Sequence, residues 1–131
     1  MSKEQLYIFD TTLRDGAQTQ GVDFSIDDKE KISSALDKLG VDYVEGGWPG
    51  ANPTDTEFFN KDHNFKSTKL TAFGMTKKSE HSAENDPMLS SLINSKSTSV
   101  CLFGKSWDFQ VDVALGISNE QNIMNISEST K

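Results

Sequence analysis

The spacing of four strand-like segments most constrains how this chain can fold. These apolar segments begin near Leu6, Val41, Lys69 and Ser99, and a helix-like segment follows each of them. A spacing of roughly thirty residues is typical of βα units, in which strands pair in parallel and helices connect them. Such units build either a complete small doubly wound domain or part of an eight-stranded barrel, which needs about 250 residues.

Helix start signals support this division. Ser25 and Asp28 form a capping box with Asp in place of the usual Glu or Gln, and Gly40 is placed to end that helix in a left-handed conformation. Three further helices are expected after the start signals at Asn52-Pro53, Asp86-Pro87 and Ser118–Gln121.

The apolar residues of these helices predict which faces are buried. We expect one apolar face with Ile32, Ala35, Leu36 and Leu39, and a buried stripe with Met88, Leu89, Leu92 and Ile93. The last helix is expected to contain Ile123, Met124 and Ile126 and to run into Lys131. The charged residues of the first helix, 28–31 with Asp37 and Lys38, are expected to face solvent. Residues 107–115 fit a strand and a helix alike, and we favour a short helix over the end of the fourth strand.

Length and charge exclude several classes of protein. A chain of 131 residues has room for one domain, and its formal net charge of −7 leaves no basic face for nucleic acid. Cys101, the single cysteine, lies in an apolar run, so we expect a packed thiol in a reducing compartment. The sequence shows no membrane-spanning stretch and no signal-peptide pattern, so we expect a cytoplasmic location.

Residues 7–18 join a predicted strand to a cluster of polar side chains. The apolar run Tyr7–Phe9 is followed by Asp10, Arg14, Asp15 and Gln18. Side chains at the carboxyl end of a parallel strand point into the ligand crevice of an α/β protein. An isolated Arg-Asp pair would more simply form a surface ion pair, but the flanking Thr-Thr-Leu and Gly-x-Gln favour a functional site.

The motif Asp-Thr-Thr-Leu-Arg-Asp-Gly-x-Gln at residues 10–18 closely resembles the signature of the metal-dependent acyl-CoA condensing enzymes and lyases. This family includes isopropylmalate, homocitrate and citramalate synthases and hydroxymethylglutaryl-CoA lyase. Residues 45–53, 71–74 and 105–108 are similar to its citramalate branch. The resemblance implies that residues 1–131 are the N-terminal half, about four βα units, of a catalytic TIM (β/α)8 barrel. The rest of the barrel and any regulatory domain are expected outside this chain.

The resemblance also implies a reaction. Enzymes of this branch condense acetyl-CoA with pyruvate and then hydrolyse the thioester, in isoleucine biosynthesis. A divalent metal, Mg²⁺ or Mn²⁺ by preference or else Zn²⁺, would hold the keto acid. The full-length protein is expected to be a homodimer, and the chain alone is expected to be inactive. The alternative within the family is another acceptor, as in 2-isopropylmalate or homocitrate synthase.

The resemblance implies roles for Arg14, Asp15 and Gln18, and the predicted strand ends suggest roles for Glu45 and Gln110. Arg14 matches the catalytic arginine, whose charge would stabilise a developing enolate or alkoxide oxygen of the substrate. Asp15 matches a metal ligand. Gln18 matches a position near the metal and its substrate, or is a plain loop amide. Glu45 would bind Arg14 or a metal-bound water, or only balance the charge of Arg14. Gln110 stands where a histidine is expected, and we expect it to overhang the crevice and hydrogen-bond substrate.

The remaining metal ligands, a His-x-His pair, and the general base are expected beyond Lys131. His63 and His81 are expected to be surface histidines, and Asp10 to fix the loop and Arg14. A rival from another class is a self-contained four-stranded α/β domain that uses Asp10 and Asp15 to bind a metal or phosphoryl group without catalysis. Such a domain would be a stable monomer that binds Mg²⁺ by itself.

Overall fold

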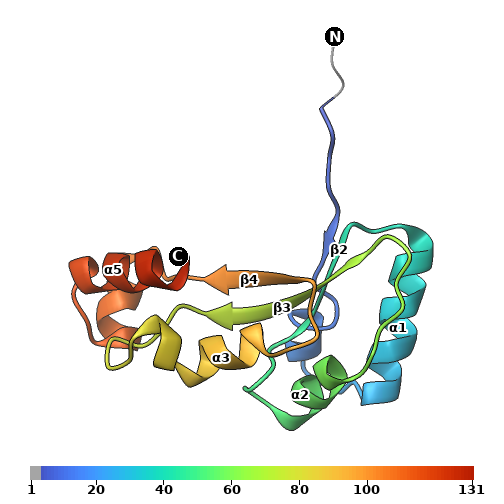
Figure 1. The fold of residues 1–131 in the computed structure, drawn as a ribbon, viewed down its shortest axis with the longest axis horizontal. Coiled ribbons are helices and arrows are strands. Elements are labelled where there is room, and N and C mark those ends of the chain that lie inside the picture. The colour runs from blue at the N-terminus through green and yellow to red at the C-terminus, as the bar shows by residue number, and fades with distance from the viewer. Residues whose placement is uncertain (1–3) are drawn as a thin grey trace.

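The computed structural model describes residues 4–131 and contains a four-stranded parallel sheet in the order β1-β2-β3-β4 (Figure 1). The strands are β1 (Phe9–Asp10), β2 (Tyr43–Gly47), β3 (Lys69–Met75) and β4 (Ser99–Phe103). Strands adjacent in sequence are adjacent in the sheet, whereas the strand order of a doubly wound domain reverses at a switch point. The predicted βα repeat is confirmed, and its sequential order is the one that the N-terminal part of a TIM barrel requires.

The helices begin where the cap signals predicted. They are α1 (Ile26–Leu39), α2 (Pro53–Asn60), α3 (Pro87–Ile93), α4 (Asp108–Gln110) and α5 (Asn119–Ser129), with short turns η1 (Gly16–Gln18), η2 (Ala83–Asn85) and η3 (Val111–Leu115). Ser25 and Asp28 form the expected reciprocal box, and Gly40 ends α1 at φ 88°. Residues 108–115 are helical, as favoured. Ser118 caps α5, but the side chain of Gln121 donates to Asn125 instead of returning to the cap.

The hydrophobic core lies between one face of the sheet and the helices α1, α2 and α3. Its buried members come from the first loop, the strands and two of these helices: Leu13, Val41, Val44, Phe58, Phe59, Leu70, Ala72, Leu89 and Leu92. Ile32 and Leu36 of α1 pack against this cluster as half-buried side chains. None of the helices in residues 4–131 has the length and apolar composition needed to cross a bilayer.

The predicted burial of α1 was wrong at several positions. Leu39 is 76% exposed and Ala35 is also exposed, whereas Lys29 and Asp37 are buried. Burial of the two charges is possible because each has partners on other elements. Asp37 accepts four hydrogen bonds of 2.9–3.1 Å from the backbone amides of residues 66–68, and Lys29 is bound by three acceptors.

The predicted buried stripe of α3 was wrong at one residue, and α5 buries polar residues. Ile93 is 79% exposed, and Ile123 and Met124 are exposed as well. The buried positions of α5 are instead Asn122 and Asn125. Each places its amide on a protein acceptor, the carbonyl of Lys105 at 2.8 Å and the hydroxyl of Ser79 at 2.9 Å. Hydrogen bonding across elements therefore outweighed apolar periodicity here.

His63 is half-buried, in contrast to the expected surface position. Its ring lies 4.5 Å from that of Phe58 and 5.5 Å from that of Phe65, measured between centroids. A ring nitrogen also lies 2.8 Å from the carbonyl oxygen of Phe58. His63 therefore takes part in packing at the end of α2.

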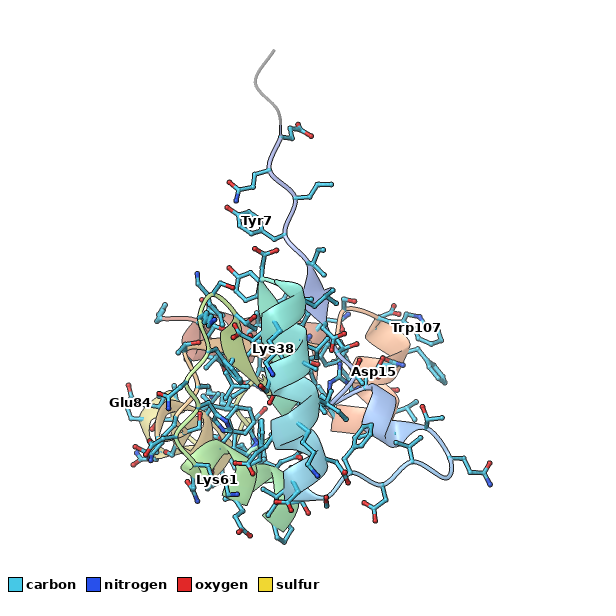
Figure 2. All side chains as sticks on the ribbon, turned by 90° about the vertical axis from the view of Figure 1, so that its right-hand side faces the viewer. Tyr7, Asp15, Lys38, Lys61, Glu84 and Trp107 are labelled. Carbon is cyan, nitrogen blue, oxygen red and sulfur yellow. The ribbon has the colours of Figure 1, made fainter. Side chains whose placement is uncertain are left out.

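Aromatic rings line the sheet face opposite to the core. Phe9 stacks on Tyr43 with 5.8 Å between centroids, and Phe73 lies 6.4 Å from Phe103. Phe9 and Phe103 are 43% and 45% exposed. Residues 4–8 extend away from the body of the molecule and carry the exposed Tyr7 (Figures 1 and 2). The site described next lies at the carboxyl end of this aromatic face.

Candidate functional site

The loop after β1 is a tight turn that presents Arg14 and Asp15. The carbonyl of Thr11 accepts hydrogen bonds from the amides of residues 14–16 at 2.8–3.2 Å. The carboxylate of Asp10 accepts from the amide and the hydroxyl of Thr12 at 3.0 and 3.1 Å. Asp10 therefore fixes the loop, as expected, through Thr12 rather than through a direct bond to Arg14 in the described chain.

The side chain of Arg14 is held on two sides. Its Nε donates to Oε1 of Glu45 at 2.5 Å, and its Cζ lies 4.2 Å above the ring centre of Phe73. The side chain of Glu45 is 2% exposed and that of Arg14 is 22% exposed. Because Nε is bound to Glu45, the two terminal nitrogens are the part of the guanidinium that can meet a ligand.

Glu45 and Phe73 come from the two neighbouring strands. Glu45 is the middle residue of β2, and Phe73 lies in the carboxyl-terminal half of β3. Parallel pairing puts the carboxyl ends of these strands at the same edge of the sheet as the loop after β1, which is how three distant segments of the chain meet. The predicted proximity of Glu45 to Arg14 is thus realised; whether Glu45 also binds substrate or a water stays a prediction.

Gln18 and Arg14 line the same pocket, of about 390 Å³. Its other walls come from the loop after β1, from α1, from the loop after β2 and from α2: Leu13, Ala17, Asp23, Phe24, Lys29, Trp48, Ala51, Asn52, Thr54 and Asp55. Gln18 is exposed on η1. It can therefore reach a molecule bound beside Arg14.

Gln110 lies apart from this pocket. It is exposed at the end of α4, and within residues 4–131 no hydrogen bond joins it to Arg14 or Glu45. Trp107, the residue before α4, lies on the same side of the molecule as Asp15 (Figure 2). The expected overhang of Gln110 above the crevice stays a prediction.

The chain has clear relatives. The profile of the HMGL-like family matches residues 5–131. The chain belongs to the HMGL-like family. The (R)-citramalate synthases of Aquifex aeolicus and Sulfolobus acidocaldarius are 48% and 47% identical to it, over 98% of this chain and 25% of each relative. The 2-isopropylmalate synthase 1 of Caldanaerobacter subterraneus is 32% identical over 100% of this chain and 32% of its own length.

These relatives confirm the resemblance to the citramalate branch that the loop at residues 45–53 indicated. The chain spans about a quarter of the length of the citramalate synthases that it matches. This HMGL-like chain therefore matches one segment of these longer relatives.

Asp15 is the candidate metal ligand of this HMGL-like chain. Its side chain is 63% exposed and its Oδ1 lies 3.4 Å from a terminal nitrogen of Arg14. A free carboxylate suits a hard divalent cation. Among residues 4–131, however, no group of three or more His, Cys, Asp or Glu side chains is close enough together to hold a metal ion. Asp15 thus fits the role of one ligand in a set that these residues do not complete.

Cys101 lies on β4 next to Glu45. It is half-buried rather than fully packed in the core. Burial raises the pKa of its thiol, and the neighbouring charge of Glu45 raises that pKa further. Both effects favour the neutral thiol over the thiolate, which is the nucleophilic form; that Cys101 is no nucleophile stays a prediction.

Sequence analysis missed two charged residues beneath the Arg14 loop. Lys29 and Asp55 form an ion pair of 2.5 Å with side chains that are 3% and 11% exposed. Lys29 stood in a run of charged residues that suggested a solvated helix face, and Asp55 stood in the first turn of α2, where acidic residues are ordinary. Nothing in the local pattern distinguished either residue, because their partners lie in other segments.

Proposed function

We propose that this chain is the N-terminal part of the barrel of an (R)-citramalate synthase, which condenses acetyl-CoA with pyruvate in isoleucine biosynthesis. One observation carries the proposal. The guanidinium of Arg14 is held by buried Glu45 and by Phe73, beside the exposed carboxylate of Asp15, in a chain 48% identical to an (R)-citramalate synthase. On the family resemblance, the complete protein would be a cytoplasmic homodimer.

The reaction needs a cation where Arg14 lies. A base removes a proton from the methyl group of acetyl-CoA, and the resulting carbon nucleophile attacks the keto carbon of pyruvate. The keto oxygen then becomes an alkoxide, and water cleaves the thioester to release coenzyme A and citramalate. The terminal nitrogens of Arg14 would stabilise the oxygen on which charge develops, an interaction that is strongest in the transition state.

The other residues of the site would bind and orient. Asp15 would supply one carboxylate ligand to a divalent cation, which when bound would polarise the keto group as a Lewis acid. Gln18 would donate a hydrogen bond to a substrate oxygen within the pocket that it shares with Arg14. Glu45 would keep Nε of Arg14 occupied and so direct the terminal nitrogens toward substrate. Gln110 would hydrogen-bond substrate from α4. We assign the general base to none of these residues.

A different acceptor is the second candidate. The 2-isopropylmalate synthase 1 of C. subterraneus is 32% identical over this chain, so a bulkier 2-oxo acid is the alternative to pyruvate. A self-contained binding domain is less well supported, because the strand order is that of a barrel segment.

The test uses a hybrid enzyme in which residues 1–131 replace the matching quarter of the A. aeolicus relative. We expect the hybrid to form citramalate from acetyl-CoA and pyruvate, and to use 3-methyl-2-oxobutanoate poorly. Residues 1–131 alone should show no turnover. Citramalate formation by the purified chain, or a hybrid that prefers the bulkier acid, would overturn the proposal.

Two variants of the hybrid test the assigned roles. Arg14→Lys keeps the charge but loses the planar fork, so kcat should fall more than the affinity for pyruvate. Asp15→Asn should raise the metal concentration needed for half-maximal activity. Wild-type kinetics and metal titration in both variants would show that the site is wrongly assigned.

A further inference from the structure

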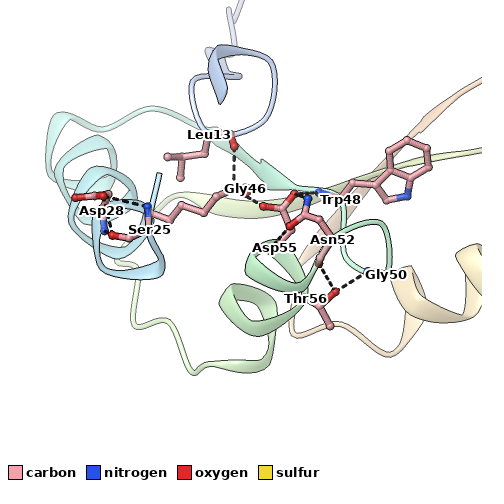
Figure 3. A network of polar contacts seen from close by, with 10 residues as sticks. Leu13, Ser25, Asp28, Gly46, Trp48, Gly50, Asn52, Asp55 and Thr56 are labelled. Atoms are coloured by element: carbon pink, nitrogen blue, oxygen red, sulfur yellow. Dashed lines mark hydrogen bonds and ion pairs between the residues drawn. The ribbon is translucent and has the colours of Figure 1, made fainter. Parts of the chain in front are cut away.

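A buried ammonium group lies between the loop that carries Arg14 and the end of β2, the strand that carries Glu45. Nζ of Lys29 on α1 donates to the carbonyl of Leu13 at 2.9 Å, to the carbonyl of Gly46 at 2.8 Å and to Oδ1 of Asp55 at 2.5 Å. These contacts use all three protons of the ammonium. Leu13 directly precedes Arg14, and Gly46 directly follows Glu45. Figure 3 shows these bonds between the β1 loop, the end of β2 and α2.

The carboxylate of Asp55 completes this network on the side of β2. Its Oδ2 accepts from the amide of Trp48 and from Nδ2 of Asn52, both at 2.8 Å (Figure 3). Gly47 leaves the room for it, because a Cβ at that position would collide with the carboxylate. Lys29 and Asp55 together therefore bind the peptide groups on both sides of Gly47, at the end of β2.

Stability alone does not explain this pair. Removing two charges from water is costly, and apolar residues of similar volume often serve a helix contact as well or better. The carbonyls of Leu13 and Gly46, in contrast, can be satisfied in this buried place only by a donor. The feature that distinguishes Lys29 is thus its contact with two peptide groups, the one that precedes Arg14 and the one that follows Gly46, the neighbour of Glu45.

We propose that Lys29 is a positioning residue of the candidate site. Its ammonium sets the spacing between the Leu13–Arg14 peptide and the Gly46–Gly47 peptide, and so holds the guanidinium with Nε on Glu45 and the terminal nitrogens on the side of Asp15, where substrate would bind. The catalytic importance of this spacing rests on the proposed function, in which Arg14 meets the developing negative charge. The spacing itself can be tested without any substrate.

The chain supplies a matched control pair. Lys61 at the end of α2 binds Glu30 of α1 at 2.9 Å, so this pair also joins α1 to α2. The side chains of Lys61 and Glu30 are 39% and 36% exposed, and the pair contacts neither loop of the site. Lys29→Met and Lys61→Met therefore remove the same charge from the same helix contact, but only the first removes the bridge between the loops.

The experiment follows the side-chain Nε–H signal of Arg14 by NMR in the ¹⁵N-labelled 131-residue chain, with Arg14→Lys to assign it. In Lys29→Met we expect exchange of this proton with water to rise by about tenfold or more, the factor that loss of a hydrogen bond to a charged group gives. Lys61→Met should leave it unchanged. Lys29→Met alone leaves the buried carboxylate of Asp55 without its cation and could prevent folding. The double variant Lys29→Met/Asp55→Asn removes that charge and keeps an oxygen that accepts from the amide of Trp48. The same NMR measurement is therefore made on the double variant as well.

The double variant gives the decisive outcomes. Fast exchange at Arg14 in a folded double variant supports positioning, since a role in helix docking alone would leave that signal unmoved. Wild-type exchange in the folded protein would overturn the proposal. Failure of the double variant to fold would overturn it too, because the pair would then be required for the fold itself. None of these outcomes depends on whether the hybrid enzyme makes citramalate.

Discussion

Replacing Glu45 by Gln tests whether the site is built around a buried charge pair. The variant keeps an oxygen that can accept from Nε of Arg14, but it removes the negative charge. Exposed ion pairs contribute at most about 1 kcal/mol, whereas removing one member of a buried pair costs about 3–5 kcal/mol. Glu45 is 2% exposed and Arg14 is 22% exposed. With the acceptor retained, we expect a loss of about 2 kcal/mol in the free energy of unfolding.

Urea denaturation followed by circular dichroism measures this loss. For a small protein the free energy of unfolding falls by about 2 kcal/mol per molar urea, so a loss of about 2 kcal/mol lowers the urea midpoint by about 1 M. Glu30→Gln is the matched control, because its pair with Lys61 is exposed, and it should cost less than about 0.5 kcal/mol. Arg14→Met leaves Glu45 buried without its partner and should cost about 3 kcal/mol.

The double variant of Arg14 and Glu45 completes the cycle. The two losses should be non-additive by at least about 1 kcal/mol, because the second change removes a group that the first has already left unpaired. Additive losses, or a Glu45→Gln variant as stable as Glu30→Gln, would refute the view that a buried carboxylate anchors the arginine.

Three further perturbations test separate parts of the structure. The amides of residues 66–68 lower the pKa of Asp37 to about 2, so the stabilisation that this carboxylate provides is complete above the ordinary value of 3.8 and is lost as the pH falls through 2. Thermal melts between these values should therefore show a flatter pH dependence for Asp37→Asn than for wild type. Gly47→Ala should destabilise the chain more than Gly40→Ala in urea, because φ is positive at both residues but only at Gly47 does a Cβ collide, with Asp55. Gln110→His in the hybrid enzyme should leave turnover near pH 8 unchanged; a large gain with a new ionisation near neutrality would show that the position transfers a proton.

Local signals in the sequence determined much of the fold. The β4 strand, the capping box at Ser25 and the end of α1 at Gly40 were predicted where they occur, because strand propensity and helix capping depend on a few adjacent residues. Arg14, Asp15 and Gln18 came from one continuous motif, which is why they could be singled out without knowledge of the fold.

Tertiary structure decided which charges are buried and what they hold. Lys29 bonds Asp55 across 26 residues of sequence, and Asp37 bonds amides 29 to 31 residues away, so neither contact leaves a trace in helical periodicity. The contact between Arg14 and Glu45 could be expected from the sequence, because parallel pairing of β1 and β2 brings these two segments to one edge of the sheet, but only the folded chain shows that Nε forms the bond. The sequence alone determined which residue types were available for chemistry. Their orientation depended on partners that only the folded chain brings together, since a charge is buried only where those partners replace the water that it loses.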